Sequence, residues 1–353
     1  MIPRAFGESA PFSLGAEEEL FVVDAEALAP AVVPPDVLRG ERVKPELFAA
    51  VVEVATGICA DAAMLLDEVG ALRGEAAERL AGHGLALAGT GTWPTAVPEE
   101  QQITPDPGYL RFIEFAGSSA QRQFCSGLHV HVGVESADAC MTALEHVLPW
   151  LPLLLAVSAN SPWLAGRESG LCSTRAEILA LLPRSGAPPV FDSYADWERF
   201  AERLLELDLA DTYRRIWWDA RPHPSLGTLE IRMPDQPGRA ESTAAFAALV
   251  QALVASAEPG PPADRGIYAE NRWAASRFGR DARLIHPDGT RLVPVPELLD
   301  ELFARVGAKA EELGGAPLLD PLAGLDQAGE QLELGRREGL DALCRRLVAL
   351  AVA

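Results

Sequence analysis

The sequence has little positive charge. Its 353 residues include 30 lysines and arginines against 51 aspartates and glutamates, so the formal net charge is -21. Nucleic acids and anionic membrane surfaces attract basic proteins, and this balance argues against nonspecific binding to either. A polyanionic ligand would need a local basic pocket or bound metal ions to approach the chain. We therefore expect no nucleic-acid partner and no membrane partner.

Cysteine is also scarce. The five cysteines are an odd number and contain no C-x-x-C spacing, which argues against a disulfide framework and against a structural zinc site. They are Cys59, Cys125, Cys140, Cys172 and Cys344. This usage fits a reducing compartment, so we expect a cytoplasmic protein.

Long hydrophobic segments are missing as well. Residues 1–15 lack the apolar core of a signal peptide, and the longest apolar run, residues 147–159, is too short and too rich in proline to span a bilayer. We interpret that run as a buried helix. No internal repeat or low-complexity tail is present, and the length allows one large domain or two ordinary ones.

Residues 127–134, GLHVHVGV, alternate apolar and imidazole side chains. A period of two predicts a β-strand, with His129 and His131 on one face and the apolar residues on the other. Two histidines on one face suit a metal or catalytic site. The alternative is a half-buried strand whose histidines make ordinary hydrogen bonds.

Two further strand candidates carry carboxylates. In GAEEELFVVD, residues 15–24, Glu17 and Glu19 share one face, where their repulsion must be offset by cations if the strand is buried and costs little if the strand is a solvated edge. Glu53 lies in the middle of the apolar run AAVVEVATG, residues 49–57. A buried carboxylate there needs either a metal or an ion pair with an arginine.

A fourth strand candidate, TLEIRM at residues 228–233, places Glu230 and Arg232 on one face, either as functional groups or as an exposed cross-strand ion pair. The loop at residues 160–177 is rich in arginine for so acidic a chain. Its Asn160, Arg167 and Arg175 suit a polar ligand, although a plain surface loop is the alternative.

Helical spacing of apolar residues predicts helices between these strands and after them. The expected helices cover residues 61–82, 136–159, 192–209 with Asp192 as the cap, 240–257 and 268–282, followed by a C-terminal helical cap. Arg272 and Arg277 in the helix at 268–282 either line one side of a site or form a solvated face.

The strand candidates share one property, because each sets polar residues into an otherwise apolar run. In one mainly antiparallel sheet they would place four carboxylates, two imidazoles and a guanidinium on a single face: Glu17, Glu19, Glu53, His129, His131, Glu230 and Arg232. Such a face suits hard divalent cations, Mg²⁺ or Mn²⁺, better than zinc. Metals on a carboxylate face commonly bind nucleotide phosphates, whose charge they neutralise.

Five segments resemble a known family and occur in its order: GAEEELFVVD, GLHVHVGV, NSPWLAGRESG, RPHPSLGTLEIRMPD and ENRWAASRFG. They resemble the carboxylate-amine ligases of the type 2 glutamate–cysteine ligase family and, more distantly, the glutamine synthetases. The resemblance implies an α+β fold, with a curved, mainly antiparallel sheet and helices packed on its outer face. It also implies one catalytic domain over residues 1–353.

The resemblance also implies roles for individual residues. One metal would be bound by Glu19 and Glu53, and a second metal by Glu17, His129 and Glu230. The transferred phosphoryl group would be contacted by Arg232, which forms the catalytic pair with Glu230. We expect His131, Arg272 and Arg277 beside the nucleotide, and Arg167, Arg175 and Asn160 beside the substrates. The third carboxylate that glutamine synthetases use on the first metal has no assigned counterpart.

The activity implied by the resemblance is amide formation driven by ATP with Mg²⁺ or Mn²⁺. A substrate carboxylate attacks the γ-phosphate, and an amine displaces phosphate from the resulting acyl phosphate. Glutamate and cysteine are the family's namesake pair, and relatives suggest a homo-oligomer. The alternatives are a phosphotransferase on the same kind of sheet and a non-catalytic metal-binding or nucleotide-binding protein.

Overall fold

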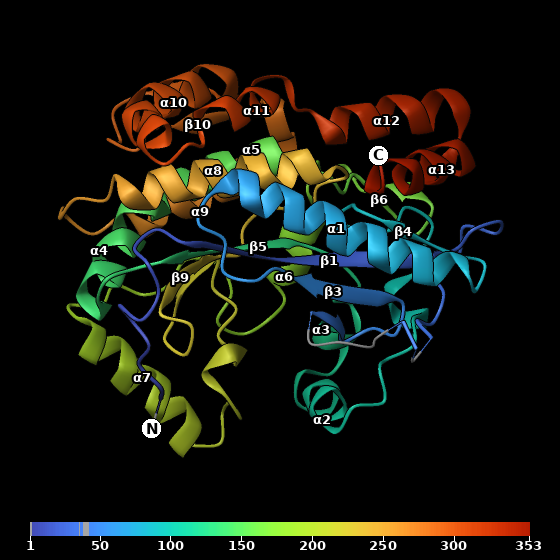
Figure 1. Ribbon diagram of the computed structural model, residues 1–353, viewed down its shortest axis with the longest axis horizontal. Coiled ribbons are helices and arrows are strands. Elements are labelled where there is room, and N and C mark those ends of the chain that lie inside the picture. The colour runs from blue at the N-terminus through green and yellow to red at the C-terminus, as the bar shows by residue number, and fades with distance from the viewer. Residues whose placement is uncertain (1, 35, 38–41) are drawn as a thin grey trace.

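The computed structural model describes residues 2–34, 36–37 and 42–353 (Figure 1). At its centre lies a seven-stranded sheet in the order β2-β3-β1-β5-β9-β8, with β4 also paired to β1. All its strand pairs are antiparallel. Its strands are β1 (Leu14–Asp24), β2 (Val43–Pro45), β3 (Val51–Ala55), β4 (Leu85–Ala88), β5 (Leu128–Gly133), β8 (Ala220–His223) and β9 (Thr228–Ile231). The predicted α+β class with a mainly antiparallel sheet is confirmed.

Strand β1 is the longest strand and organises the sheet. It pairs with β3 on one side, and on the other with β5 along its first half and β4 along its second. Ala16, Glu18 and Leu20 are buried, whereas Glu17 and Glu19 between them are partly exposed. This alternation gives the sheet two chemically different faces.

Helices cover one face of the sheet. In Figure 1, α1 and α8 lie directly above β1, and α10 to α13 form a further layer over them. The long helices are α1 (Ala62–Ala81), α4 (Ala137–Val147), α5 (Leu151–Ser158), α7 (Tyr194–Glu206), α8 (Ala240–Ala255), α9 (Arg265–Phe278), α10 (Val295–Glu312), α12 (Gln327–Glu338) and α13 (Leu340–Ala351). The main hydrophobic core lies between this face and α4, α5, α8 and α10.

Shorter elements complete the chain. They are the helices α2 (Pro107–Ala116), α3 (Ser118–Gln121), α6 (Thr174–Leu179) and α11 (Asp320–Gly324), five short 3₁₀ turns, and the hairpins β6 (Trp163–Leu164) with β7 (Arg167–Glu168) and β10 (Arg283–Ile285) with β11 (Leu292–Pro294). In Figure 1, α2, α3 and α7 lie on the side of the sheet opposite α1 and α8. The second face of the sheet is therefore bordered by α7, by the shorter helices α2 and α3, and by loops.

Local capping explains where two helices begin. The side chain of Asp61 accepts a hydrogen bond from the backbone N–H of Met64 at the start of α1. Helix α7 begins one residue later than predicted, because Ser193 and not Asp192 is the cap and accepts from the N–H of Asp196. The predicted cap at Asp192 was therefore wrong.

The predicted buried helix at residues 147–159 is confirmed in part of that range by α5, which is buried throughout. Together with α4 and a 3₁₀ turn it forms a helical stretch, Ala137–Ser158, of 22 residues with mean hydropathy 1.5. By length and composition this stretch could cross a membrane, contrary to our expectation. Its prolines do not interrupt it, because they stand in the first turns of their helices, where proline is tolerated. However, 78% of its apolar window is buried in the protein, as in a core helix.

Candidate active site

The strand register brings the polar strand residues together on the second face of the sheet. Three cross-strand pairs form this face: Glu17 with His129, Glu19 with Glu53, and His131 with Glu230. Arg232 follows directly after β9, and its guanidinium donates to Glu230. The prediction that these seven residues share one face is confirmed.

A cavity of about 530 Å³ lies in front of this face. One part of its lining is acidic and comes from β1, β3 and the turn before β3: Glu17, Glu19, Glu46 and Glu53. Another part is basic and comes from residues near β8, β9 and α6: Arg175, Arg214, Arg215, Arg221 and Arg232. Carboxylates that can hold cations thus face guanidinium groups that can hold anions.

Glu17, His131 and Glu230 form a potential metal site, since one donor atom from each lies within 4.8 Å of the others. The Nδ1 atom of His131 lies 3.0 Å from the hydroxyl of Thr228. Its buried Nε2 atom has no hydrogen-bond partner among the described residues and lies 3.7 Å from a carboxylate oxygen of Glu17. Metal-binding histidines commonly bond one ring nitrogen to a neighbour and leave the other for the metal.

His129 lines the cavity and lies beside Glu17, Glu19 and Arg232. Its Nδ1 atom lies 3.3 Å from Glu17 and 3.4 Å from the guanidinium of Arg232, and its Nε2 atom lies 4.0 Å from Glu19. Burial and the charge of Arg232 lower its pKa. We predicted His129 at the metal and His131 beside the nucleotide. Both rings lie close to a Glu17 carboxylate oxygen, at 3.3 and 3.7 Å, and the two roles stay predictions.

A second acidic cluster lies between β1 and β3. Burial and the charges of Glu19 and Glu53 raise the pKa of Glu46 well above its usual range, and burial and the charge of Glu17 raise that of Glu53 to about 7. Lys44, 3.3 Å from Glu53, is the nearest cation. The repulsion between these carboxylates, which contributes to the raised pKa values, would be offset by a divalent cation.

Glu46 is the carboxylate that sequence reasoning missed at this cluster. It lies in the turn between β2 and β3, where no strand periodicity assigns it to a face. The available signal was weak, namely an acidic residue just before an apolar segment.

Cation binding at this cluster should depend on pH. Because the pKa of Glu53 in the metal-free fold is about 7 and its ordinary value is 4.5, the fold binds a proton that the unfolded chain has lost. The stability of the metal-free protein should therefore fall as pH rises from about 4.5 to 7. A ligating carboxylate must be ionised, so we expect Mg²⁺ to bind roughly tenfold more weakly at pH 6 than at pH 8.

Titration calorimetry at several pH values measures this affinity. The matched variant is Lys44→Met, which removes a charge that lowers the pKa of Glu53 and should move the midpoint of the pH dependence upward. A Mg²⁺ affinity that does not change between pH 6 and pH 8 would contradict this assignment.

Glu230 is held ionised by two arginines. Arg221 donates two hydrogen bonds to its carboxylate, at 2.6 and 3.2 Å, and Arg232 donates another. Although burial opposes ionisation, Arg221 and Arg232 hold the pKa of Glu230 well below its usual range. Arg221 was missed in the sequence, although the alternation in β8 gave a signal by placing Arg221 and His223 on one face.

Of the six residues that we predicted beside the ligands, His131 and four others do not line the cavity. Arg167 is exposed in the hairpin of β6 and β7, and Arg277 is exposed and stacks on Phe278 at the end of α9. Asn160 and Arg272 are buried and make structural hydrogen bonds, Asn160 to the carbonyl of Gln236 and Arg272 to Asp219. The sequence showed that these polar residues are close together along the chain, but not in which direction their side chains point.

Arg175 is the one residue of that group that reaches the cavity. Its guanidinium donates to the carbonyls of Met233 and Arg232, each at 3.2 Å, and lies 3.9 Å from Asp235. Its Nε atom is buried and has no hydrogen-bond partner among the described residues. Arg175 therefore supports the segment that carries Arg232.

The chain is similar to known proteins over most of its length. The family model described as glutamate–cysteine ligase family 2 matches residues 13–337. A putative glutamate–cysteine ligase 2-3 of Rubrobacter xylanophilus is 39% identical over 321 residues, which cover 88% of this chain and 87% of that protein. A glutamate–cysteine ligase of Haloferax volcanii is 33% identical and covers 95% of this chain and 96% of its own length.

The fold has a solved counterpart. The crystal structure of a glutamate–cysteine ligase from Francisella tularensis in complex with AMP superposes with a TM-score of 0.73 and covers 98% of this chain and 89% of that one, at 15% identity. The sequence-based expectation of a carbon–nitrogen ligase of this type is confirmed by the family match. This chain belongs to glutamate–cysteine ligase family 2.

Proposed function

We propose that this enzyme is an ATP-dependent and Mg²⁺-dependent or Mn²⁺-dependent carboxylate-amine ligase that joins glutamate to cysteine through an acyl phosphate. The observation that carries the proposal is the single sheet face, where two carboxylate clusters lie side by side and guanidinium groups line the same cavity. Matches to proteins named glutamate–cysteine ligase support the choice of substrates.

The residues fit two divalent cations. Glu17, His131 and Glu230 would hold one, as the free Nε2 atom of His131 suggests. Glu19, Glu46 and Glu53 would hold the other, as the raised pKa values of Glu46 and Glu53 suggest. Bound cations would neutralise the nucleotide phosphates, which this acidic protein otherwise repels.

Arg232 and Arg221 have different tasks in the proposed reaction. Arg232 reaches the cavity and stabilises negative charge on the transferred phosphoryl oxygens. Arg221 also lines the cavity, and its two hydrogen bonds keep Glu230 ionised and correctly oriented. The chemistry needs no covalent nucleophile, and burial raises the pKa of Cys125, the cysteine in the cavity lining, to about 12. That thiol is therefore unreactive at neutral pH.

The partners in this proposal are small amino-acid substrates and the nucleotide, bound by one catalytic domain in the cytoplasm. The homo-oligomer suggested by the resemblance stays a prediction.

Product analysis tests the proposed function. Purified enzyme with Mg²⁺, ATP, glutamate and cysteine should release ADP and phosphate in equal amounts and form γ-glutamylcysteine, identified by mass. Omitting either amino acid should stop sustained ADP release. A phosphorylated product that forms without the amine would instead support a phosphotransferase. Mg²⁺-dependent nucleotide binding without turnover across a panel of amino-acid pairs would support a non-catalytic binding protein.

A further inference from the structure

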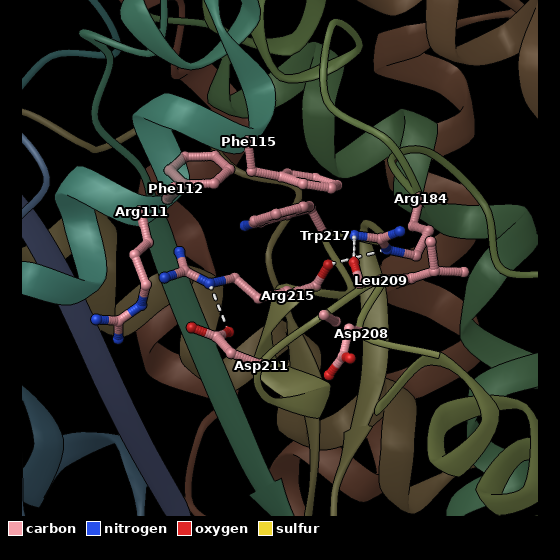
Figure 2. Close-up of a pocket in the computed structure, with 10 residues that line it drawn as sticks. Arg111, Phe112, Phe115, Arg184, Asp208, Leu209, Asp211, Arg215 and Trp217 are labelled. Atoms are coloured by element: carbon pink, nitrogen blue, oxygen red, sulfur yellow. Dashed lines mark hydrogen bonds and ion pairs between the residues drawn. The ribbon is translucent and has the colours of Figure 1, made fainter. Parts of the chain in front are cut away.

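A second, smaller cavity of about 170 Å³ adjoins the catalytic cavity, and we call it the side chamber. Its walls combine apolar or aromatic groups with guanidinium groups, as Figure 2 shows: Phe112, Phe115, Leu209, Trp217, Arg111, Arg184 and Arg215. Phe112, Arg215 and Trp217 line both cavities. A ligand in the side chamber would thus lie next to the catalytic cavity, against side chains that line both cavities.

Two of the arginines hold the walls in place. Arg215 donates to Asp211 at 3.1 Å and to the carbonyl of Gly108 at 3.2 Å, and its guanidinium lies 4.8 Å from the ring centre of Phe112. Arg184 donates to the carbonyl of Arg215 at 3.1 Å and lies 5.6 Å from the ring centre of Trp217. These contacts link α2 to the segment before β8, so the walls are formed without a ligand.

The rim of the side chamber is different, because its groups lack partners. Phe115 is 55% exposed and Leu209 is 45% exposed, although both point into a concave site. Arg111 is exposed, and its side chain has no hydrogen bond or ion pair with any described residue. The rim therefore offers apolar surface together with one unpaired positive charge, Arg111, and one carboxylate without a partner among the described residues, Asp208. This combination suits a ligand that has an apolar part and both an anionic and a cationic group.

The position of the side chamber favours one substrate over the others. None of its lining residues belongs to the central sheet, which carries the acidic clusters. In the proposed reaction, the carboxylate substrate and the phosphates must lie against those clusters to be activated. The amine substrate attacks from beside them, so its remaining atoms extend away from the sheet.

We propose that the side chamber binds the amine substrate and that it accepts an α-amino acid with a large apolar or aromatic side chain. The side chain lies against Phe112, Phe115 and Trp217, and the carboxylate pairs with Arg111. This inference rests on the proposed function for the direction of attack, and it differs from it in the amine, because the preferred amine substrate is larger than cysteine. The short –CH2–SH side chain of cysteine would fill only a small part of such a chamber.

Binding measurements test the inference independently of turnover. The probes are leucine and phenylalanine, titrated by calorimetry into the enzyme with Mg²⁺, glutamate and a non-hydrolysable ATP analogue. Ala210→Trp places a large ring in the side chamber and should weaken the binding of both probes at least about tenfold. Leu207→Trp is the matched control, because Leu207 is 61% exposed and does not line the chamber, and it should leave binding unchanged.

Arg111 is tested with paired ligands. The wild-type enzyme should bind leucine about tenfold more tightly than 3-methylbutylamine, which lacks the carboxylate. Arg111→Ala should remove this difference, and Arg111→Lys should restore part of it.

The outcomes separate the two proposals. The side-chamber inference would be overturned if the wild-type enzyme bound neither probe, or if Ala210→Trp bound the probes as tightly as the wild-type enzyme does. This holds even if cysteine is ligated. Weaker binding of the ATP analogue in Ala210→Trp, with the probes unaffected, would assign the chamber to the nucleotide and also overturn it. Probe binding that responds to Ala210→Trp, with no amide formed from any amine, would support the inference and overturn only the proposed function.

Discussion

Glu230→Gln should lower the rate of ADP release about a hundredfold to a thousandfold with saturating substrates. Glutamine keeps the shape of the side chain but removes the negative charge that Glu230 contributes beside Glu17 and His131. It also removes the anion that orients Arg232 toward the cavity. Both the cation site and the phosphoryl contact should therefore be weakened together.

Steady-state kinetics measures this loss, and thermal unfolding followed by circular dichroism shows whether the fold persists. The matched control is Glu145→Gln, which also removes a carboxylate from an arginine pair, with Arg265, but outside the catalytic cavity. It should keep the wild-type rate. If Glu230→Gln turns over at the wild-type rate, the second face of the sheet is not the catalytic face.

Arg73→Met should reduce the free energy of unfolding by about 3–5 kcal/mol. Arg73 donates two hydrogen bonds to the carboxylate of Glu18, at 2.6 and 2.8 Å, and both side chains are buried between the sheet and the helices. Gln236 and Thr243 also donate to Glu18, but they are neutral. Without the guanidinium, a buried carboxylate would remain with no opposite charge.

Urea unfolding measures this change. Arg337→Met serves as the control, since Arg337 pairs with Glu333 and Glu338 on the exposed surface of α12. It should change stability by less than about 0.5 kcal/mol. The double variant Glu18→Gln with Arg73→Met should recover part of the loss, because it removes the unpaired charge. A loss below about 1 kcal/mol for Arg73→Met would show that the neutral donors alone satisfy Glu18.

The three consecutive glutamates in β1 show where sequence reasoning reaches its limit. Alternation placed Glu17 and Glu19 on one face, and the strand register confirms this. The same alternation places Glu18 on the helix side, but only the fold shows that Arg73 of α1 meets it there. Local periodicity defines the face of a residue, whereas its partner depends on contacts between distant parts of the chain.

The two histidines of β5 show the same division. Alternation alone put His129 and His131 on one face with the carboxylates, and the family resemblance gave them different roles. Their actual surroundings depend on the neighbouring strands, since Thr228 of β9 engages one nitrogen of His131 and leaves the other facing Glu17. Arg232, which also comes from the end of β9, contacts His129.

The sequence by itself determined the α+β class, the strands that carry polar residues and the ligase family, because a period of two and short motifs are local properties of the chain. Only the tertiary structure brought Glu46 and Arg221 to the site, directed Asn160 and Arg272 into structural hydrogen bonds, and formed the side chamber between α2 and the segment before β8. These features lie in turns, loops and interior contacts, where the direction of a side chain depends on packing between residues far apart in sequence and not on local periodicity.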